Sequence, residues 1–184
     1  MTLAIVVAGG DGTDLASVAP LPAADVVIAA DSGLDHARSL GLEPSILVGD
    51  LDSISAAGLH WAHEQGLRVD RHPADKDATD LELALHVAAE MADDILVVDT
   101  SDDRRDHGVG NLLLLASAQF AHVRLSARVA GAIVTVVWGQ RELHGEVGDV
   151  VSLFAVGGAA HGVTTSGLRW PLSDATLEPG STLG

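Results

Sequence analysis

Two carboxylates one residue apart close an apolar run in the segment ILVGDLDSIS, residues 46–55. Residues two apart in an extended chain point to the same side, so Asp50 and Asp52 can share one cation. A third acid, Asp80, opens a predicted helix. Carboxylates gathered at one place repel each other unless a hard cation such as Mg²⁺ lies among them, and that ion prefers oxygen ligands. We therefore expect Asp50, Asp52 and Asp80 to bind Mg²⁺, although any one such Asp, taken alone, more often forms an Asx-turn or caps a helix.

Two basic residues lie within acidic stretches, Lys76 in ADKDATD and Arg104 in SDDRRDH. A metal ion among acids, in a chain with few basic residues, suits a phosphate substrate whose charge the metal neutralises. Lys76 and Arg104 could then each hold a phosphate group. The alternative is that each pairs with a neighbouring Asp.

The elements that must position these residues alternate between short β-branched runs and Ala- and Leu-rich stretches, which is typical of an α/β fold with a mostly parallel sheet. We expect strands over 3–8, 25–30, 45–49, 68–71 and 94–99, and helices within 31–41, 54–66, 79–91 and 111–120. Thr79 and Glu82 have the spacing of a capping box, which makes Thr79 the N-cap and Asp80 the first helical residue.

Acids follow most of these predicted strands. Ligands of an open α/β sheet bind beyond the carboxyl ends of its strands, where loops meet helix N-termini. The acids expected at this edge are Asp11, Asp31, Asp50, Asp52, Asp77, Asp80, Asp99, Asp102, Asp103 and Asp106.

The pattern changes after about residue 125. Three apolar runs, 132–138, 149–156 and 162–170, are separated by Gly-rich turns without a helical period between them. We therefore expect an α/β domain over 1–125 and a smaller all-β domain over 126–184.

Composition limits the classes of partner. The 184 residues include 26 Asp and Glu against 10 Lys and Arg, and the net charge of -16 would repel nucleic acid and anionic membranes. The absence of Cys excludes disulfides and thiolate zinc sites. His60 and His63 could face a zinc ion, but without an evident third ligand we expect an exposed helix with Trp61 turned inward. No segment has the length of a membrane span or the pattern of a signal peptide, so we expect a cytoplasmic protein.

Taken together, the motifs resemble those of the thiamin pyrophosphokinase family. The matching segments are ADSGLDHA for the family's D-G-G, PSILVGDLDSIS for P-D-x-I-x-G-D-F-D-S, KDATDLELAL for K-D-x-T-D-x-E-x-A-L, RRDHGVGNLLLL for G-G-R-x-D-H-x-x-x-N, and VSLFAVGGAAHGVTTSGLRWPL for the β-domain signature ending T-x-G-L-K-Y-x-L. They occur in the family's order over nearly the whole chain.

The resemblance implies a Rossmann-like α/β catalytic domain, a β-sandwich domain that binds thiamin, and a homodimer with sites near the subunit interface. The implied reaction transfers a pyrophosphoryl group from ATP to thiamin and gives thiamin diphosphate and AMP. Asp50, Asp52 and Asp80 would hold Mg²⁺ with Asp31 and Asp106 nearby, while Lys76 and Arg104 would steady phosphates.

Further residues of the matching motifs are implied to bind the substrates. Those implied for the nucleotide side are Asp31, Gly33, Asp77, Thr79, His107 and Asn111. On the thiamin side, Thr165 and Ser166 accompany Trp170, which could stack on the cationic thiazolium ring. The alternative for Trp170 is a place in the core of the β-domain.

Three segments depart from the family pattern. DDR replaces G-G-R, SGL replaces D-G-G, and the sequence ends at EPGSTLG where the family continues into a strand bearing S-N-E that helps to hold thiamin. The β-domain is therefore expected to be truncated at its C-terminus. Two other functions stay open: a pyrophosphokinase with another heterocyclic acceptor such as a hydroxymethylpterin, and a non-catalytic protein that binds a nucleotide or thiamin.

Overall fold

The computed structural model describes residues 1–10, 15–99 and 104–181. These residues form two compact units, Met1–Trp138 and Gly139–Gly184, which are described separately. In the described ranges no helix is both long and apolar enough to cross a lipid bilayer.

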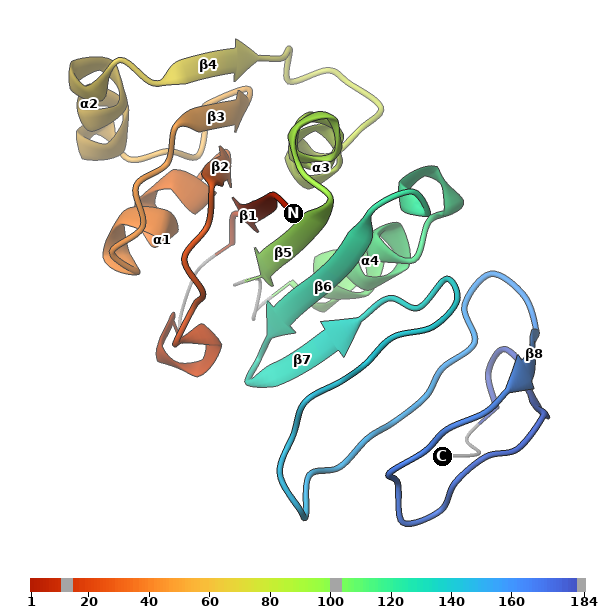
Figure 1. Ribbon diagram of the computed structural model, residues 1–184. Coiled ribbons are helices and arrows are strands. Elements are labelled where there is room, and N and C mark those ends of the chain that lie inside the picture. The colour runs from red at the N-terminus through yellow and green to blue at the C-terminus, as the bar shows by residue number, and fades with distance from the viewer. Residues whose placement is uncertain (11–14, 100–103, 182–184) are drawn as a thin grey trace. The chain divides into compact units, whose positions relative to one another are not determined.

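The first unit is built on a seven-stranded sheet with the strand order β4-β3-β2-β1-β5-β6-β7 (Figure 1). Its strands are β1 (Leu3–Val7), β2 (Val26–Ala30), β3 (Ile46–Gly49), β4 (Arg68–Arg71), β5 (Asp94–Asp99), β6 (Arg124–Val129) and β7 (Ala132–Thr135). All neighbouring pairs are parallel except β6 and β7. The strand order turns back at β1, whose neighbours are β2 and β5. Parallel strands place their carboxyl ends at one edge, which is the ligand-binding edge of such sheets.

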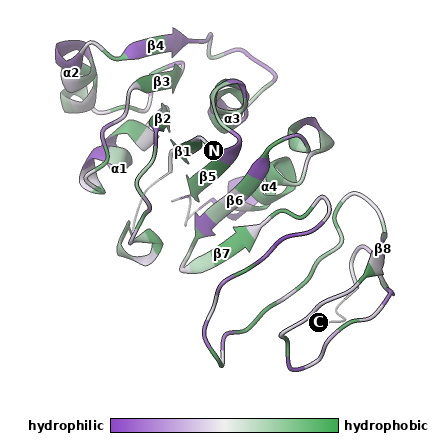
Figure 2. Ribbon diagram, in the orientation of Figure 1, coloured by the Kyte–Doolittle hydropathy of each residue, from purple (hydrophilic) through white to green (hydrophobic). Residues whose placement is uncertain are grey.

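Helices cover both faces of this sheet, as Figure 1 shows. The helical elements are η1 (Leu15–Val18), α1 (Gly33–Ser39), α2 (Ala56–Gln65), α3 (Asp80–Met91), α4 (Arg105–Leu115) and η2 (Ala118–Phe120). Leu81 and Leu85 of α3 pack with Ile28 and Val48 on one face. On the other face, α1 and α2 pack against β2 and β3. In Figure 2 the central strands, which are covered on both faces, are mainly apolar, whereas the edge strand β4 is hydrophilic.

The sequence predictions for this unit are largely confirmed. The expected α/β class is observed, and β1 to β5 lie where strands were expected, all of them apolar runs except the exposed edge strand β4. Buried parallel strands produce such continuous apolar runs because both of their faces are covered. Thr79 is the N-cap of α3 and Asp80 is its first residue, as expected.

The expected change of pattern at residue 125 does not coincide with the boundary between the compact units. β6 pairs with β5 over six residues, and β7 folds back onto β6 through Ala130 and Gly131, which have φ angles of 47° and 77°. A two-residue loop with two positive φ angles is typical of a tight hairpin between twisted strands. The segment 124–135 therefore extends the sheet, and the first unit ends at Trp138.

The second unit contains one antiparallel strand pair in its described part, β8 (Ala160–Val163) with β9 (Ala175–Leu177). The strand expected over 149–156 is not formed, and the prediction for it is wrong. Among the described residues of this unit its apolar side chains are not packed into a core: Val150 is exposed and Phe154 is 77% exposed. An apolar alternating run becomes a strand only where a partner strand and a packed face are present.

Candidate active site

Three carboxylates meet at the carboxyl ends of β2 and β3. Asp31 follows β2, and its backbone N–H donates to the carbonyl of Val48 at 2.8 Å, which fixes it beside the end of β3. Asp31, Asp50 and Asp52 each offer a carboxylate oxygen, and these oxygens lie within 4.8 Å of one another. We call these three residues the acid cluster. The structure thus brings Asp50 and Asp52 together with Asp31, which the family resemblance placed near them.

The geometry that joins Asp50 and Asp52 differs from the expected extended segment. β3 ends at Gly49, and Leu51 between the two acids has a φ of 71°. The backbone N–H of Asp52 donates to Asp50 Oδ1 at 3.2 Å. The acids therefore converge through a turn, because a left-handed residue reverses the alternation of an extended chain. Leu51 packs against the apolar residues beneath α1 and α2, which holds this uncommon conformation in place.

Asp31 is the buried member of the acid cluster. It is 8% exposed, and within the described part of the chain its Oδ1 atom is buried and accepts no hydrogen bond. Burial, followed by repulsion from Asp80 and Asp50, raises the pKa of Asp31 above its ordinary value. An orphaned buried carboxylate oxygen beside two more carboxylates fits a hard divalent cation, because such an ion supplies the missing positive charge and accepts all-oxygen ligation.

Lys76 lies between two acids of this edge. Its Nζ atom is 3.1 Å from Asp80 Oδ1 and 3.4 Å from Asp50 Oδ2. Burial opposes the charge of Lys76, but the two carboxylates outweigh it and raise the pKa of its ammonium. The backbone N–H of Asp52, and then Lys76, lower the pKa of Asp50. Asp80, expected in the metal set, is not a member of the acid cluster, and its Oδ1 atom contacts the Lys76 ammonium.

Two glycines make this packing possible. Gly49 has a φ of 144°, and a Cβ on it would lie 3.0 Å from Asp80 Oδ1 and 3.2 Å from Asp31 Cβ. Gly33, expected at the nucleotide, would place a Cβ 2.1 Å from the Val7 carbonyl oxygen. Gly33 therefore allows α1 to begin against the end of β1, which is a packing role.

The first turn of α3 fixes Asp80. The Thr79 hydroxyl accepts the Glu82 N–H at 3.2 Å, which confirms the cap predicted from the sequence. The Glu82 side chain does not return to Thr79; its Oε1 accepts a hydrogen bond from Gln119 Nε2 at 3.1 Å. Asp77, also expected at the nucleotide, is exposed in the loop before this helix.

Arg104 and Asp106 form a separate pair at the start of α4. Arg104 Nε and Nη2 donate to the two Asp106 oxygens at 3.0 and 2.8 Å, and Nη2 lies 2.8 Å from His107 Nε2. The hydrogen bond from Arg104 lowers the pKa of Asp106. All three side chains are more than half exposed, and the structure records no contact between them and the acid cluster within the described residues. Arg104 thus pairs with a nearby Asp, which is one of the two roles that the sequence suggested for it.

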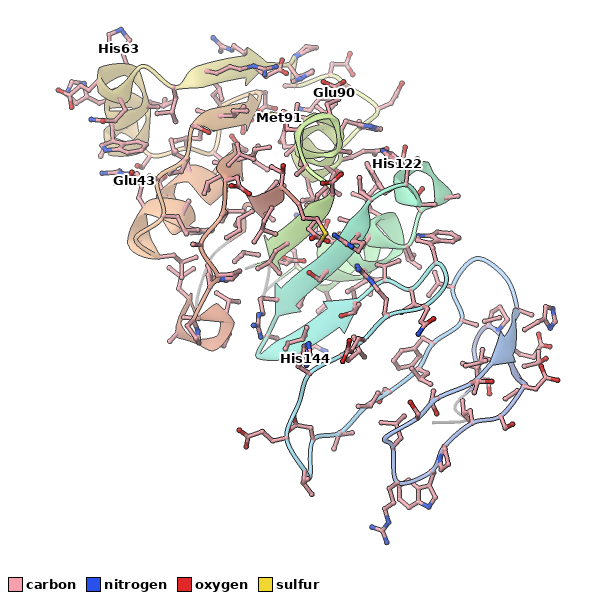
Figure 3. The ribbon with its side chains drawn as sticks, viewed as in Figure 1. Glu43, His63, Glu90, Met91, His122 and His144 are labelled. Carbon is pink, nitrogen blue, oxygen red and sulfur yellow. The ribbon has the colours of Figure 1, made fainter. Side chains whose placement is uncertain are left out.

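Asn111 of α4 reaches the end of β5. Its Nδ2 donates to Asp99 Oδ2 at 3.0 Å, and Asp99 is buried. Asp11, Asp102 and Asp103 lie outside the described residues. His63 points outward from α2 (Figure 3), and His60 pairs with Glu64 at 3.3 Å, so the exposed helix expected there is confirmed.

The residues expected at thiamin lie near a turn of the second unit. The Leu172 N–H donates to Thr165 Oγ1 at 2.8 Å, while Ser166 is exposed. Trp170 is 74% exposed, and the Arg169 guanidinium lies 4.9 Å from its ring centroid. The alternative that Trp170 belongs to the core is therefore wrong for this chain.

Sequence reasoning missed two residues on the segments that carry the acid cluster. Leu51 carries no signal, because a left-handed Leu is rare and its neighbours suggest an extended chain. Asp35 binds Ser55 at the start of α2. The position of Asp35 in the first turn of a predicted helix can be read from the sequence, but its hydrogen bond to the distant Ser55 cannot.

Comparison with known proteins finds matches over most of the chain. A family model described as the thiamin pyrophosphokinase catalytic domain matches residues 20–127, and one described as the vitamin B1 binding domain of thiamin pyrophosphokinase matches residues 140–184. Thiamine pyrophosphokinase of Bacillus subtilis is 26% identical over 159 residues, which span 85% of this chain and 74% of the relative.

Solved structures show the same fold. A crystal structure of thiamine pyrophosphokinase from Bacillus subtilis matches with a TM-score of 0.75 and 24% identity over 98% of this chain and 86% of that one. Thiamin pyrophosphokinase from Geobacillus thermodenitrificans matches with a TM-score of 0.70 and 25% identity over 98% and 85% of the two chains. Since the catalytic-domain model alone matches more than half of its residues, the chain belongs to the thiamin pyrophosphokinase family.

Proposed function

We propose that this protein transfers a pyrophosphoryl group from ATP to the hydroxyl of thiamin in a Mg²⁺-dependent reaction that yields thiamin diphosphate and AMP. The observation that carries the proposal is the acid cluster with the orphaned Asp31 oxygen, in a chain of this family. The metal that such a cluster would hold neutralises phosphate charge and orients the transferred group. Asp31, Asp50 and Asp52 are its proposed ligands.

The reaction needs positioning more than covalent help from the protein. The thiamin hydroxyl oxygen bonds to the β-phosphorus of ATP, and the bond from that phosphorus to the oxygen that bridges it to the α-phosphorus breaks. AMP leaves with the electrons of the broken bond, and the hydroxyl proton is released. Lys76 is proposed to hold a phosphate with its ammonium group, which is already positioned between Asp50 and Asp80. When Lys76 turns to phosphate, Asp80 becomes available as a further ligand.

The two compact units are proposed to divide the substrates between them. The first unit carries the acid cluster and would bind ATP and Mg²⁺, and the second matches the vitamin B1 binding model and would bind thiamin. Exposed Trp170 offers a flat aromatic face to the thiazolium ring, with Thr165 and Ser166 near it. Arg104, Asp106 and His107 are proposed to meet the nucleotide phosphates from the start of α4, and Asp77, Thr79 and Asn111 to complete the nucleotide side.

We also propose a homodimer. Support comes from the family resemblance and from large exposed apolar side chains of the second unit, such as Val150 and Phe154. Sedimentation equilibrium measures the mass in solution, and a monomer at all concentrations contradicts this part of the proposal.

The decisive test is AMP release from ATP, measured with and without thiamin and across a Mg²⁺ titration. We expect release only when both thiamin and Mg²⁺ are present. A hydroxymethylpterin replaces thiamin in a parallel reaction, and turnover with the pterin alone would identify the other acceptor. ATP or thiamin that binds saturably without any turnover would make the protein a binding protein and overturn the proposal.

A variant pair tests the metal assignment in the same assay. Asp52→Asn removes one charge and one proposed ligand, so activity is lost while the metal-free protein becomes more stable, because a repelling charge leaves the cluster. Asp75→Asn removes the same charge from an exposed position outside the cluster and serves as the matched control. Equal activity of the two variants would refute the role of Asp52.

A further inference from the structure

A single carboxylate ties the beginning of α2 to the first turn of α1. Asp35 Oδ2 accepts the Ser55 N–H at 2.9 Å, and Asp35 Oδ1 accepts the Ser55 hydroxyl at 2.8 Å. The Ser55 hydroxyl in turn accepts the Gly58 N–H at 2.9 Å as the N-cap of α2. Asp35 thus engages both polar groups of the residue at which α2 begins.

This link is close and is reinforced nearby. A Cβ on Gly58 would lie 2.5 Å from Asp35 Oδ1, so the approach depends on a glycine at that position. One turn further along α1, the Arg38 guanidinium lies 4.9 Å from the ring centroid of Trp61 in α2 and 3.9 Å from Asp35 Oδ1. Two contacts therefore hold the start of α2 against α1.

The segment between β3 and Ser55 carries two members of the acid cluster. It begins after Gly49, whose carbonyl accepts the His72 N–H at 3.0 Å, and it ends at the Ser55 pair with Asp35. Asp50 and Asp52 lie on the few residues between these fixed ends, with left-handed Leu51 between them. A short segment with both ends held has few conformations left, so its carboxylates keep one arrangement.

Asp31 and Asp35 share one rigid segment. The Asp31 carbonyl accepts the Leu34 N–H at 3.0 Å, and the Ser32 carbonyl accepts the Asp35 N–H at 3.1 Å. Asp31, which belongs to the cluster, therefore lies four residues before Asp35 in a hydrogen-bonded turn. Asp35 in turn holds the end of the loop that carries Asp50 and Asp52. Asp35 and Ser55 thus connect the segment of Asp31 with the segment of Asp52.

From this geometry we infer that Asp35 is a positioning residue that sets the spacing of the acid cluster and thereby its affinity for a divalent cation. The inference rests on the proposed function, because it takes the cluster to be the metal site. Residues that orient metal ligands typically change metal affinity by about 10- to 100-fold when they are removed. Asp35 itself is not a member of the cluster.

The test compares Asp35→Ala, Asp35→Asn and Asp25→Ala by titration with Mn²⁺ in the presence of a non-cleavable ATP analogue, with free Mn²⁺ read by electron paramagnetic resonance. Asp25 is the matched control because its Oδ2 accepts the Leu3 N–H at 2.8 Å, a similar long-range carboxylate bond at the beginning of β1. We expect Asp35→Ala to weaken Mn²⁺ binding about tenfold or more. The Mn²⁺ affinity of Asp35→Asn and of Asp25→Ala should stay within about threefold of wild type, because the amide oxygen that replaces the Asp35 carboxylate can still accept from the Ser55 N–H and Asp25 binds at the beginning of β1 rather than at the cluster.

Amide hydrogen exchange of Ser55 and Gly58 shows independently that the link has opened, because both amides lose protection in Asp35→Ala and keep it in Asp25→Ala. In the enzyme assay, Asp35→Ala should require more Mg²⁺ for half of the maximal rate and approach the wild-type rate at saturation. If Asp35→Ala keeps the wild-type Mn²⁺ affinity although the Ser55 amide exchanges rapidly, the inference about Asp35 is overturned and the proposed metal site is not. Wild-type protein that binds no Mn²⁺ saturably overturns the metal site and the inference with it.

Discussion

Replacement of Gly49 by Ala tests how tightly the end of β3 is packed. The added Cβ would lie 3.2 Å from Asp31 Cβ and 3.0 Å from Asp80 Oδ1. The Asp80 carboxylate can turn away only by leaving Lys76, which it contacts at 3.1 Å. Asp31 Cβ has less freedom, because the Asp31 N–H is held by the Val48 carbonyl. Gly49 also has a φ of 144°, which residues with a Cβ rarely adopt.

Two costs add in this variant. A backbone conformation that disfavours a Cβ costs about 1–2 kcal/mol, and an extra methyl in a tightly packed place costs about 1–3 kcal/mol. We therefore expect Gly49→Ala to lower the free energy of unfolding by about 2–5 kcal/mol, a large share of the roughly 5–15 kcal/mol of an ordinary domain. The same methyl pushes Asp31 and Asp80 apart, so the Mg²⁺ requirement of the reaction should rise.

Urea denaturation measures the loss, and Gly66→Ala is the matched control. Gly66 ends α2 with a φ of 65°, and a Cβ on it would meet nothing within 4 Å, so this variant carries the backbone cost alone. The difference between the two variants, about 1–3 kcal/mol, combines the steric cost at the acid cluster with any difference in backbone cost between φ angles of 144° and 65°. If both variants lose the same free energy, the end of β3 has room for a side chain and the reasoning is wrong.

Three further predictions concern other parts of the molecule. Asp31→Asn should stabilise the metal-free protein at pH 7, because burial raises the pKa of Asp31 and its ionised form destabilises the fold. In urea denaturation at a series of pH values, this gain in the free energy of unfolding should shrink as the pH falls through the raised pKa and vanish below the ordinary value of 3.8. A gain that does not depend on pH contradicts this prediction. Thr79→Ala should cost about 1 kcal/mol in urea denaturation, because the Glu82 N–H loses its acceptor, and an unchanged midpoint would disprove the cap. Trp170→Ala should change the free energy of unfolding by less than about 0.5 kcal/mol, since the side chain is exposed, yet raise KM for thiamin; an unaltered KM rules out stacking.

The sequence was sufficient where burial imposes a strong pattern. β1, β2, β3 and β5 lie between covered faces, and their apolar runs reveal them, whereas β4 is a mostly exposed edge strand with the sequence RVDR. β6 was missed because Leu125 and Ala127 are buried while Arg124, Ser126 and Arg128 between them are only partly covered, so the run has no continuous apolar character. The segment 149–156 has the apolar character of a strand but lacks a partner within the described residues of its unit. Whether a segment has a partner strand depends on the rest of the fold, so the sequence of the segment alone does not predict it.

The acid cluster was predicted in composition better than in geometry. Strand ends of a parallel sheet share one edge, which is enough to bring Asp31, Asp50 and Asp52 together. The left-handed Leu51 could not be foreseen, because local propensity argues against it and only its packing beneath α1 and α2 supports it. The place of Asp80 beside Lys76 depends on side-chain contacts between a loop and a helix, which spacing alone does not determine.

The chain order of the acid cluster has a consequence for how the protein can be cut and rejoined. All members of the cluster, together with Lys76, Asp80 and the Asp35 link, lie within the fifty residues from 31 to 80, in the loops that follow β2, β3 and β4, in α1 and at the starts of α2 and α3. A circular permutant reopened at the Ala130–Gly131 hairpin keeps this stretch covalently intact. One reopened between β4 and Lys76 separates the ammonium from Asp50 in the chain and leaves their meeting to folding alone.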